Sequence, residues 1–358
     1  MKPLGIYIHV PFCDTKCPYC DFYSIRGKNI NKDNYIKAIK RELSRDWRAQ
    51  SHFVDTIYFG GGTPSTLSGE QIAEIISCVR DNFNVSDNVE ITVECNPSSA
   101  MEDVIAAYVT AGVNRVSLGL QSAVESERKG LGRFADRKRI SEVLELVHLN
   151  GIKNVSLDVM IGLPNQTVET LDETLDYCIE TGVSHISAYM LQIEEGTVFE
   201  KRADKLNLPS DETVGDMYLH MIERLESAGI KQYEISNFAK PGFESRHNLK
   251  YWHCEEYLGI GPAAHSFFDG KRFYYERNLP AFEAGSLELV EDGEGGDFEE
   301  RLMLALRLTE GFKGELPKRI TDKVKSPQMA DYVILDEDGL RLTKKGFLVS
   351  NTIISELI

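Results

Sequence analysis

The sequence predicts an α/β fold, a partial (β/α)6 barrel of the TIM type, followed by a smaller C-terminal α+β domain. Strand-like and helix-like runs alternate six times before residue 230, a pattern typical of a parallel sheet with helices outside it. Beyond residue 230 the alternation stops. We therefore expect residues 1–235 to form the barrel core, residues 236–297 an extension rich in aromatic residues and histidine that ends in a linker, and residues 298–358 the C-terminal domain.

The six strand–helix units follow one another closely along the chain. The first combines the apolar run LGIYIHV (4–10) with an amphipathic helix over residues 34–50. Each later unit pairs a predicted strand with a predicted helix. They are strand 54–59 with helix 69–83, strand 89–94 with helix 101–112, strand 115–120 with a helix ending near Asn150, strand 154–160 with helix 167–181, and strand 185–191 with helix 211–228.

The last part of the chain has a different pattern. Residues 278–297 are rich in glycine and acidic residues and predict a linker, and an amphipathic helix is expected over 298–309. In residues 332–357, two short strands flank the turn DEDG and a helix follows, which resembles a small winged-helix module. Because no basic recognition face is evident, we interpret this module as a structural cap or a partner surface.

The composition is that of an ordinary globular protein. The 358 residues are 42% hydrophobic and 27% charged, so a sizeable core is available. The net charge of −16 argues against broad nucleic-acid binding, which needs an excess of lysine and arginine. No apolar run is long enough to span a membrane and no signal-peptide pattern opens the chain, which predicts a cytoplasmic protein.

Polar residues fall at the ends of the predicted strands. A cysteine-rich loop follows the first strand and GGGTP (60–64) follows the second, while Glu94, Gln121 and Asp158 lie at or near the ends of the next three. In a barrel of parallel strands these ends meet at one mouth, where ligands bind. Each polar residue alone could simply cap the next helix. Three such polar residues on successive strands, beside the cysteine-rich loop and GGGTP, favour a binding site.

Three of the seven cysteines, Cys13, Cys17 and Cys20, have the spacing C-x3-C-x2-C. An odd number of cysteines in a chain with no export signal argues against a disulfide framework. Three thiolates can each hold one iron of a [4Fe–4S] cluster and leave the fourth iron open to a ligand. The alternative is a structural zinc ion with His9 or Cys95 as the fourth ligand.

This loop, placed after the first strand of an α/β barrel, resembles the radical SAM superfamily, in which S-adenosylmethionine binds the open iron of the cluster. GGGTP matches the glycine motif of that family. The resemblance implies that Glu94 and Asp158 accept hydrogen bonds from the cosubstrate and that Arg133 pairs with its carboxylate, whereas a surface arginine is the alternative for Arg133. Tyr19 could pack against the adenine. The residues expected to contact S-adenosylmethionine are Tyr7, Tyr19, Gly61, Gly62, Thr63, Glu94, Gln121, Arg133 and Asp158.

The resemblance narrows to the oxygen-independent coproporphyrinogen III oxidase group and its relatives. Matching motifs cover most of the chain: YIHVPFCDTKCPYCDF (7–22), FGGGTPS (59–65), VECNP (93–97), NRVSLGLQS (114–122), LGR (131–133), SLDVMIGLP (156–164) and YEISNFA (233–239). The oxidases carry a further cysteine two residues after the third cluster ligand and a long N-terminal extension. Here Phe22 takes that position and three residues precede the first strand, which favours the heme chaperones of the same group.

A second motif points to heme. RHNLKYW (246–252) contains H-N-x-x-Y-W, the pattern associated with heme binding in those chaperones. His247 is the expected axial ligand, with Tyr251 and Trp252 as walls against the porphyrin. The alternative is a packed aromatic loop in which His247 only forms a hydrogen bond. His253 and His265 are further candidates, and His265 could be a second axial ligand or simply fill a turn.

The resemblance implies a protein that binds heme as cargo and transfers it to apo-hemoproteins such as respiratory-chain enzymes, with transient association at the membrane. The cluster and S-adenosylmethionine would regulate transfer or the formation of a homodimer. The sequence does not decide whether the protein is an enzyme, because the alternative function is that of the oxygen-independent coproporphyrinogen III oxidase. A third reading is a structural scaffold with zinc or an inert cluster.

Overall fold

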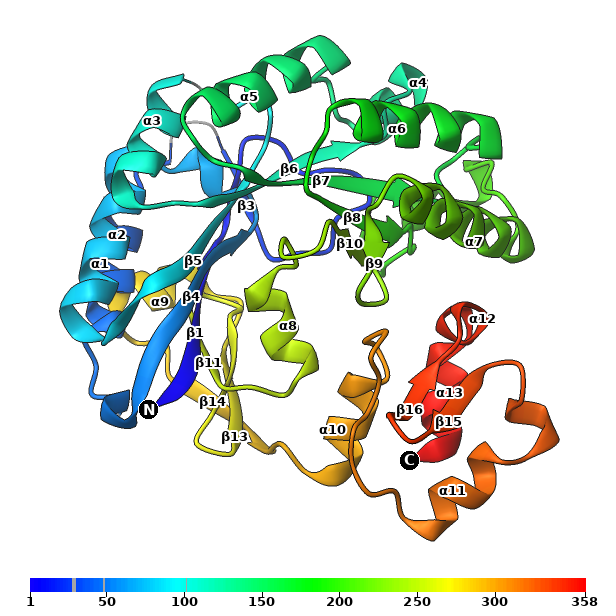
Figure 1. Cartoon of the computed structure of the whole chain (residues 1–358). Coiled ribbons are helices and arrows are strands. Elements are labelled where there is room, and N and C mark those ends of the chain that lie inside the picture. The colour runs from blue at the N-terminus through cyan, green and yellow to red at the C-terminus, as the bar shows by residue number, and fades with distance from the viewer. Residues whose placement is uncertain (28–29, 48, 101) are drawn as a thin grey trace.

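The computed structural model describes residues 1–27, 30–47, 49–100 and 102–358 (Figure 1). Twelve strands of this described part form one sheet in the order β14-β13-β12-β11-β1-β4-β5-β6-β7-β8-β10-β9. The six strands from β1 to β8 in this order are parallel, and each is followed by at least one helix. The predicted α/β fold with six successive units is therefore confirmed.

The parallel strands are buried along most of their length, as expected for strands covered by helices, although the first four residues of β5 are not buried. They are β1 (Lys2–Val10), β4 (His52–Gly61), β5 (Val85–Cys95), β6 (Arg115–Gln121), β7 (Asn154–Ile161) and β8 (His185–Met190). The helices of the six units are α1 (Asp33–Leu43), α2 (Gly69–Asn82), α3 (Glu102–Ala111), α4 (Glu125–Gly130), α5 (Arg137–Leu149), α6 (Val168–Glu180) and α7 (Asp211–Ser227). Figure 1 shows these helices along the outer side of the curved sheet.

Local sequence signals set several of the helix boundaries. Ser68 and Gln71 form a reciprocal capping box at the start of α2, and Thr167 and Thr170 form one at the start of α6. The first helix is shorter than the predicted 34–50 because α1 ends at Leu43. The Trp47 indole donates a hydrogen bond of 2.8 Å to the carbonyl of Glu42, which satisfies one of the carbonyls left free at this helix end.

Residues 236–297 extend the same sheet at both of its edges. At one edge, β10 (Asn237–Ala239) pairs antiparallel with β8 and with β9 (Lys231–Gln232). At the other edge, β11 (Tyr257–Ile260) pairs parallel with β1 and continues through β12 (His265–Phe268) and β13 (Lys271–Tyr275). Helix α8 (Arg246–Trp252) lies on the inner, concave side of the sheet (Figure 1).

The predicted linker is instead a folded segment. It contains α9 (Leu279–Ala284), whose Leu279 and Phe282 are buried, and β14 (Leu289–Glu294), which pairs with β13 at the edge of the sheet. An edge strand with one exposed side carries charged residues, so its composition is similar to that of a linker. The division at residue 235 stays a prediction, and the sheet itself runs across it.

The C-terminal part contains α10 (Phe298–Ala305), α11 (Lys318–Val324), the hairpin of β15 (Val333–Asp336) and β16 (Gly339–Leu342), α12 (Lys344–Leu348) and α13 (Ser350–Leu357). The expected hairpin is present, two short helices follow it where one was expected, and the likeness to a winged helix stays a prediction. The backbone N–H of Ile235 donates to the carbonyl of Arg307 at 2.9 Å, which attaches this part to the barrel. In the described part of the chain, no helix is long and apolar enough to cross a membrane.

Candidate functional site

The cysteine-rich loop is closed by a short parallel pairing. Strand β2 (Phe12–Cys13) pairs with β3 (Ile25–Arg26), so the loop between them begins and ends beside the end of β1. The ring of Phe12 is fully buried against Tyr35, with ring centroids 5.2 Å apart, and this contact fixes the start of the loop. The Cys13 thiol lies 3.4 Å from the hydroxyl of Thr63 in the GGGTP segment. Two of the sequence motifs are therefore in direct contact.

The three thiols form one chemical group. Burial raises the pKa of Cys20, and the neighbouring Cys17 and Cys13 raise it further, so the three sulfur atoms lie close enough to influence one another. Ionised together they would repel one another, and iron cations would remove that repulsion. Among the described residues, no three such donor side chains surround a point suited to a single metal ion. The donor set fits a cluster in which each thiolate binds its own iron.

The two residues considered as a fourth ligand have other partners. The His9 ring shares a hydrogen bond of 3.2 Å with the Tyr7 hydroxyl, and its other nitrogen lies 3.0 Å from the carbonyl of Tyr23. Cys95 is buried, and its thiol contacts the carbonyl of Val93 at 3.8 Å. His9 therefore holds the far end of the cysteine loop against β1.

The glycine motif allows β4 to end directly beneath this loop. Gly61 has φ +112°, and a Cβ there would lie 2.7 Å from the ring of His9. A Cβ on Gly62 would lie 2.7 Å from the carbonyl oxygen of Phe12, while its own N–H donates to the carbonyl of Val10 at 2.9 Å. A side chain at either position would push the cysteine loop away from the sheet.

Two half-buried carboxylates, Glu94 and Asp158, lie at the barrel mouth. The Tyr58 hydroxyl donates a hydrogen bond of 2.9 Å to Glu94, and the Ser117 hydroxyl donates one of 2.8 Å to Asp158. Burial, followed by the charge of Asp158, raises the pKa of Glu94 to about 7, and burial raises that of Asp158 to about 6. The helix after β7 is capped by Thr167, so Asp158 is not a helix cap. These acceptors are suited to hydroxyl or ammonium donors of a ligand.

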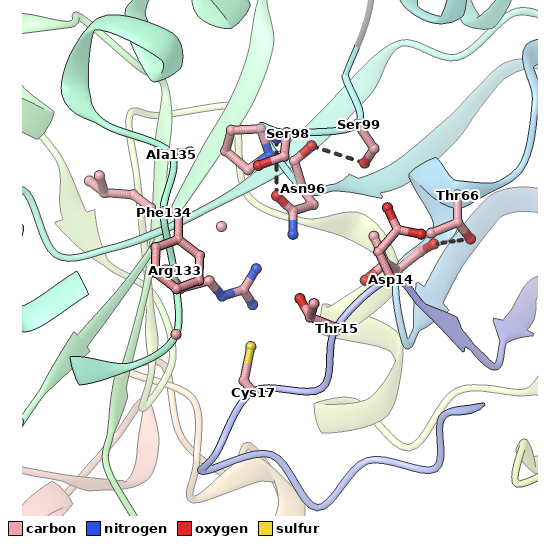
Figure 2. A pocket seen from close by; sticks show the side chains of 15 residues that line it. Asp14, Thr15, Cys17, Thr66, Asn96, Ser98, Ser99, Arg133, Phe134 and Ala135 are labelled. Carbon is pink, nitrogen blue, oxygen red and sulfur yellow. Dashed lines mark hydrogen bonds between the residues drawn. The ribbon is translucent and has the colours of Figure 1, made fainter. Parts of the chain in front are cut away.

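Gln121 and Arg133 complete this side of the mouth. Gln121 has φ +67° at a break in the β6–β7 register, a strained backbone conformation of the kind found at functional sites. Arg133 is half-buried, and its Nη2 donates a hydrogen bond of 3.4 Å to the Tyr19 hydroxyl. Its buried Nε has no partner among the described residues. Figure 2 shows the guanidinium group pointing into the pocket toward Cys17, so Arg133 is not a surface arginine.

Two adjoining pockets occupy the mouth, with volumes of about 180 Å³ and about 60 Å³, and both are lined by Thr63, Asn96, Gly119 and Arg133. The smaller pocket brings together six of the residues predicted to bind S-adenosylmethionine: Gly62, Thr63, Glu94, Gln121, Arg133 and Asp158. Gly61 lies behind it, and Tyr19 borders it through its contact with Arg133. Tyr7 does not line either pocket.

Sequence reasoning missed several residues of the site. Asn96 lies within the quoted motif VECNP and points into the larger pocket beside Ser98 and Ser99 (Figure 2). Tyr58 and Ser117 orient the two carboxylates, although they read as ordinary strand residues. A polar side chain within an otherwise apolar strand was the available signal.

The structure gives His247 a buried, fully hydrogen-bonded position. One ring nitrogen shares a hydrogen bond of 2.8 Å with the Thr56 hydroxyl and the other shares one of 2.9 Å with the Tyr251 hydroxyl. The ring stacks on Tyr58 with centroids 5.1 Å apart, and burial followed by the charge of Lys250 lowers the pKa of His247 to about 3. An axial bond from His247 to heme iron would require one of these hydrogen bonds to break, and this role stays a prediction.

The fold and the site together define the class of the protein. The model of the Radical SAM superfamily matches residues 7–178, which span the cysteine loop, the glycine motif, Glu94 and Asp158. The chain also superposes on coproporphyrinogen III oxidase (HemN) from Escherichia coli, described as a radical SAM enzyme, with a TM-score of 0.84 and 22% identity over 99% of this chain and 90% of that one.

Closer relatives share the sequence along its whole length. The chain is 32% identical to the heme chaperone HemW of Haemophilus influenzae, over 99% of this chain and 97% of that protein. It is 31% identical to the heme chaperone HemW of Lactococcus lactis, over 100% of this chain and 98% of that protein. The chain belongs to the HemW family of the radical SAM superfamily.

Proposed function

We propose that the protein is a cytoplasmic heme chaperone, which binds heme and transfers it to apo-hemoproteins such as respiratory-chain enzymes. The observation that carries this proposal is the full-length similarity to proteins named heme chaperone HemW. The likeness to HemN at 22% identity supports the fold only. Transient contact with the membrane, where respiratory enzymes reside, and a homodimer belong to the same proposal.

Cys13, Cys17 and Cys20 would hold a [4Fe–4S] cluster, and the pocket beside Arg133 would hold S-adenosylmethionine. When bound, the cluster would supply an open iron site and an electron to this cosubstrate. The chain's own residues shape that site: Arg133 can pair with a carboxylate, while Glu94 and Asp158 accept hydrogen bonds. The partnerless Nε of Arg133 supports a ligand in this pocket.

The test is anaerobic purification with iron and sulfide analysis, followed by heme titration of the same sample. We expect a shift of the Soret band that saturates at stoichiometric heme. Incubation of the heme-loaded protein with heme-depleted respiratory membranes should then restore the cytochrome spectrum. Absence of heme binding would overturn the chaperone proposal.

A second candidate is the oxygen-independent oxidase, the activity named for the HemN structure whose fold this chain shares. Phe22 stands where the resemblance described above implies a further cysteine in the oxidases. Anaerobic incubation with a reductant, S-adenosylmethionine and coproporphyrinogen III is expected to leave the substrate unchanged. Accumulation of protoporphyrinogen IX would favour the oxidase instead.

A further inference from the structure

A second cavity lies beside the cysteine loop, outside the two pockets at the barrel mouth. Its volume is about 330 Å³, within the range of roughly 300–1,000 Å³ usual for small-molecule sites. Phe22 and Tyr23, which follow the last cysteine of the loop, form one wall. Tyr251 of α8 and Tyr257 of β11 form another, with ring centroids 4.6 Å apart. The Phe22 side chain is 62% exposed, so it can contribute apolar surface to a ligand in this cavity.

We propose that this cavity is the heme site of the chaperone, with His265 as the axial ligand to iron and Arg277 as the partner of a propionate. This proposal rests on the chaperone function proposed above. It assigns the ligand to β12 rather than to helix α8. Each part follows from a separate observation.

His265 is the histidine of this cavity with free ring nitrogens. Among the described residues, six of the eight histidines have a ring nitrogen in a hydrogen bond, and the two others are His148 and His265. His148 is on the outer helix α5, whereas His265 lines the cavity. Its ring stacks on Tyr274 with centroids 5.0 Å apart and an interplanar angle of 23°, which fixes its orientation.

The charge state of His265 also suits a metal ligand. Burial lowers the pKa of His265, and the nearby guanidinium groups of Arg277 and Arg272 act in the same direction, whereas Asp292 opposes them. The ring is therefore neutral at neutral pH and has a lone pair available for iron. His9, which also lines the cavity, has both ring nitrogens engaged and cannot take this role without releasing Tyr7 or Tyr23.

Arg277 supplies the charge that a propionate requires. It lines the cavity, and its positive charge lowers the pKa of both His9 and His265. In the part of the chain that the structure describes, the exposed Arg277 has no ion pair or hydrogen bond through its side chain. These walls match a ligand that is flat and apolar, carries carboxylates, and contains a metal ion that binds imidazole nitrogen. Heme has all three properties.

This site also gives the H-N-x-x-Y-W motif a part in heme binding. The Tyr251 hydroxyl shares a hydrogen bond of 2.9 Å with His247, while the Tyr251 side chain lines the cavity. His247 would thus be a positioning residue that orients a cavity wall. A substitution of His247 would disturb heme binding without removing the iron ligand.

The test compares heme titrations of the full-length, cluster-loaded protein and four variants. We expect His265→Ala to weaken heme binding at least about tenfold, by analogy with losses of metal-site groups, and added imidazole to restore the spectrum. Arg277→Gln should weaken binding of hemin but not of its dimethyl ester, which lacks propionate charges. His148→Ala, the matched control with an equally unbonded ring, should bind as the parent does. His247→Gln should keep the spectrum of an imidazole-bound heme with reduced affinity.

The possible outcomes distinguish a wrong assignment of the heme site from a wrong chaperone function. If the parent protein binds heme and His265→Ala binds it with the same affinity and spectrum, the assignment to this cavity is wrong while the chaperone function stands. The same holds if the imidazole spectrum disappears in His247→Gln alone. If the parent protein itself binds no heme, the chaperone proposal fails first and this site fails with it.

Discussion

Single side chains decide whether the mouth of the barrel can hold its cofactors, and Cys17 gives the most direct prediction. Cys17→Ser is expected to abolish the four-iron chromophore after anaerobic reconstitution, because hydroxyl does not replace thiolate as a cluster ligand. Iron analysis and the visible spectrum measure the change. Cys254→Ser is the control, since Cys254 is also half-buried but lies near Glu300, outside the loop. Loss of the cluster in both variants would contradict the assigned ligand set.

Glu94 gives a prediction about pH. Its pKa of about 7 lies above the ordinary value of 4.5, so the folded protein keeps a proton that the unfolded chain releases between these values. The stability of the cluster-free protein should therefore fall as pH rises from about 4.5 to 7. Glu94→Gln keeps an acceptor for Tyr58 without the charge, and should raise the free energy of unfolding at pH 8 by about 1–3 kcal/mol relative to the parent.

The measurement is urea unfolding at pH 5 and pH 8. The exposed Glu145→Gln on α5 serves as the control and should not change the difference between the two pH values. The same Glu94→Gln variant should bind S-adenosylmethionine more weakly, because an amide is a poorer acceptor than a carboxylate. An equal loss of stability with pH in Glu94→Gln and the parent would show that Glu94 does not carry the effect.

At the scale of elements, the end of β4 depends on a backbone conformation that residues other than glycine rarely adopt. Gly61→Ala would combine a φ of +112° with a Cβ 2.7 Å from the His9 ring. Gly151→Ala is a matched control, with φ +89° and, among the described residues beyond its two chain neighbours, no atom within 4 Å of the added Cβ. We expect Gly61→Ala to cost at least about 1 kcal/mol more than the control and to reduce cluster incorporation. Equal stabilities, measured by urea unfolding, would mean that the loop moves aside freely.

Sequence patterns were sufficient for the elements whose periodicity reflects burial. The six strand–helix units could be predicted because a covered parallel strand is mostly apolar. The residues expected to contact S-adenosylmethionine came from the resemblance to the radical SAM superfamily, and six of them line one pocket, while their cofactor role stays a prediction. The segment over 278–297 was misread as a linker, since the acidic residues of β14 are those of an exposed edge strand. The burial of His247 depends on Thr56, a residue 191 positions away, and no local pattern contains that contact.

Whole-molecule organisation depends on a few contacts between the barrel and the C-terminal part. Arg307 accepts a backbone hydrogen bond from Ile235, and its side chain donates to Ser350 at 2.9 Å and to Asn351 at 2.5 Å. Arg307→Ala should cost about 1–2 kcal/mol and speed hydrogen exchange in α12 and α13, while S-adenosylmethionine binding is unchanged.

Lys344→Ala is the control for this prediction. Lys344 forms an exposed ion pair of 2.6 Å with Glu226, and such pairs contribute at most about 1 kcal/mol. Hydrogen exchange monitored by mass spectrometry distinguishes the two variants. If Lys344→Ala speeds hydrogen exchange in α12 and α13 as much as Arg307→Ala does, the C-terminal part is held to the barrel mainly by surface ion pairs.

The two ends of the sheet limit how copies of this chain can meet. The outermost strand β14 exposes Glu291, Asp292 and Glu294, and at the opposite end β9 is only two residues long. A second copy aligned along β14 would bring like charges together, and β9 offers too little backbone for a lasting ladder. Edge-to-edge β-pairing between copies of this chain is therefore disfavoured at both ends of the sheet, which should lower the tendency of a concentrated solution to form fibrils.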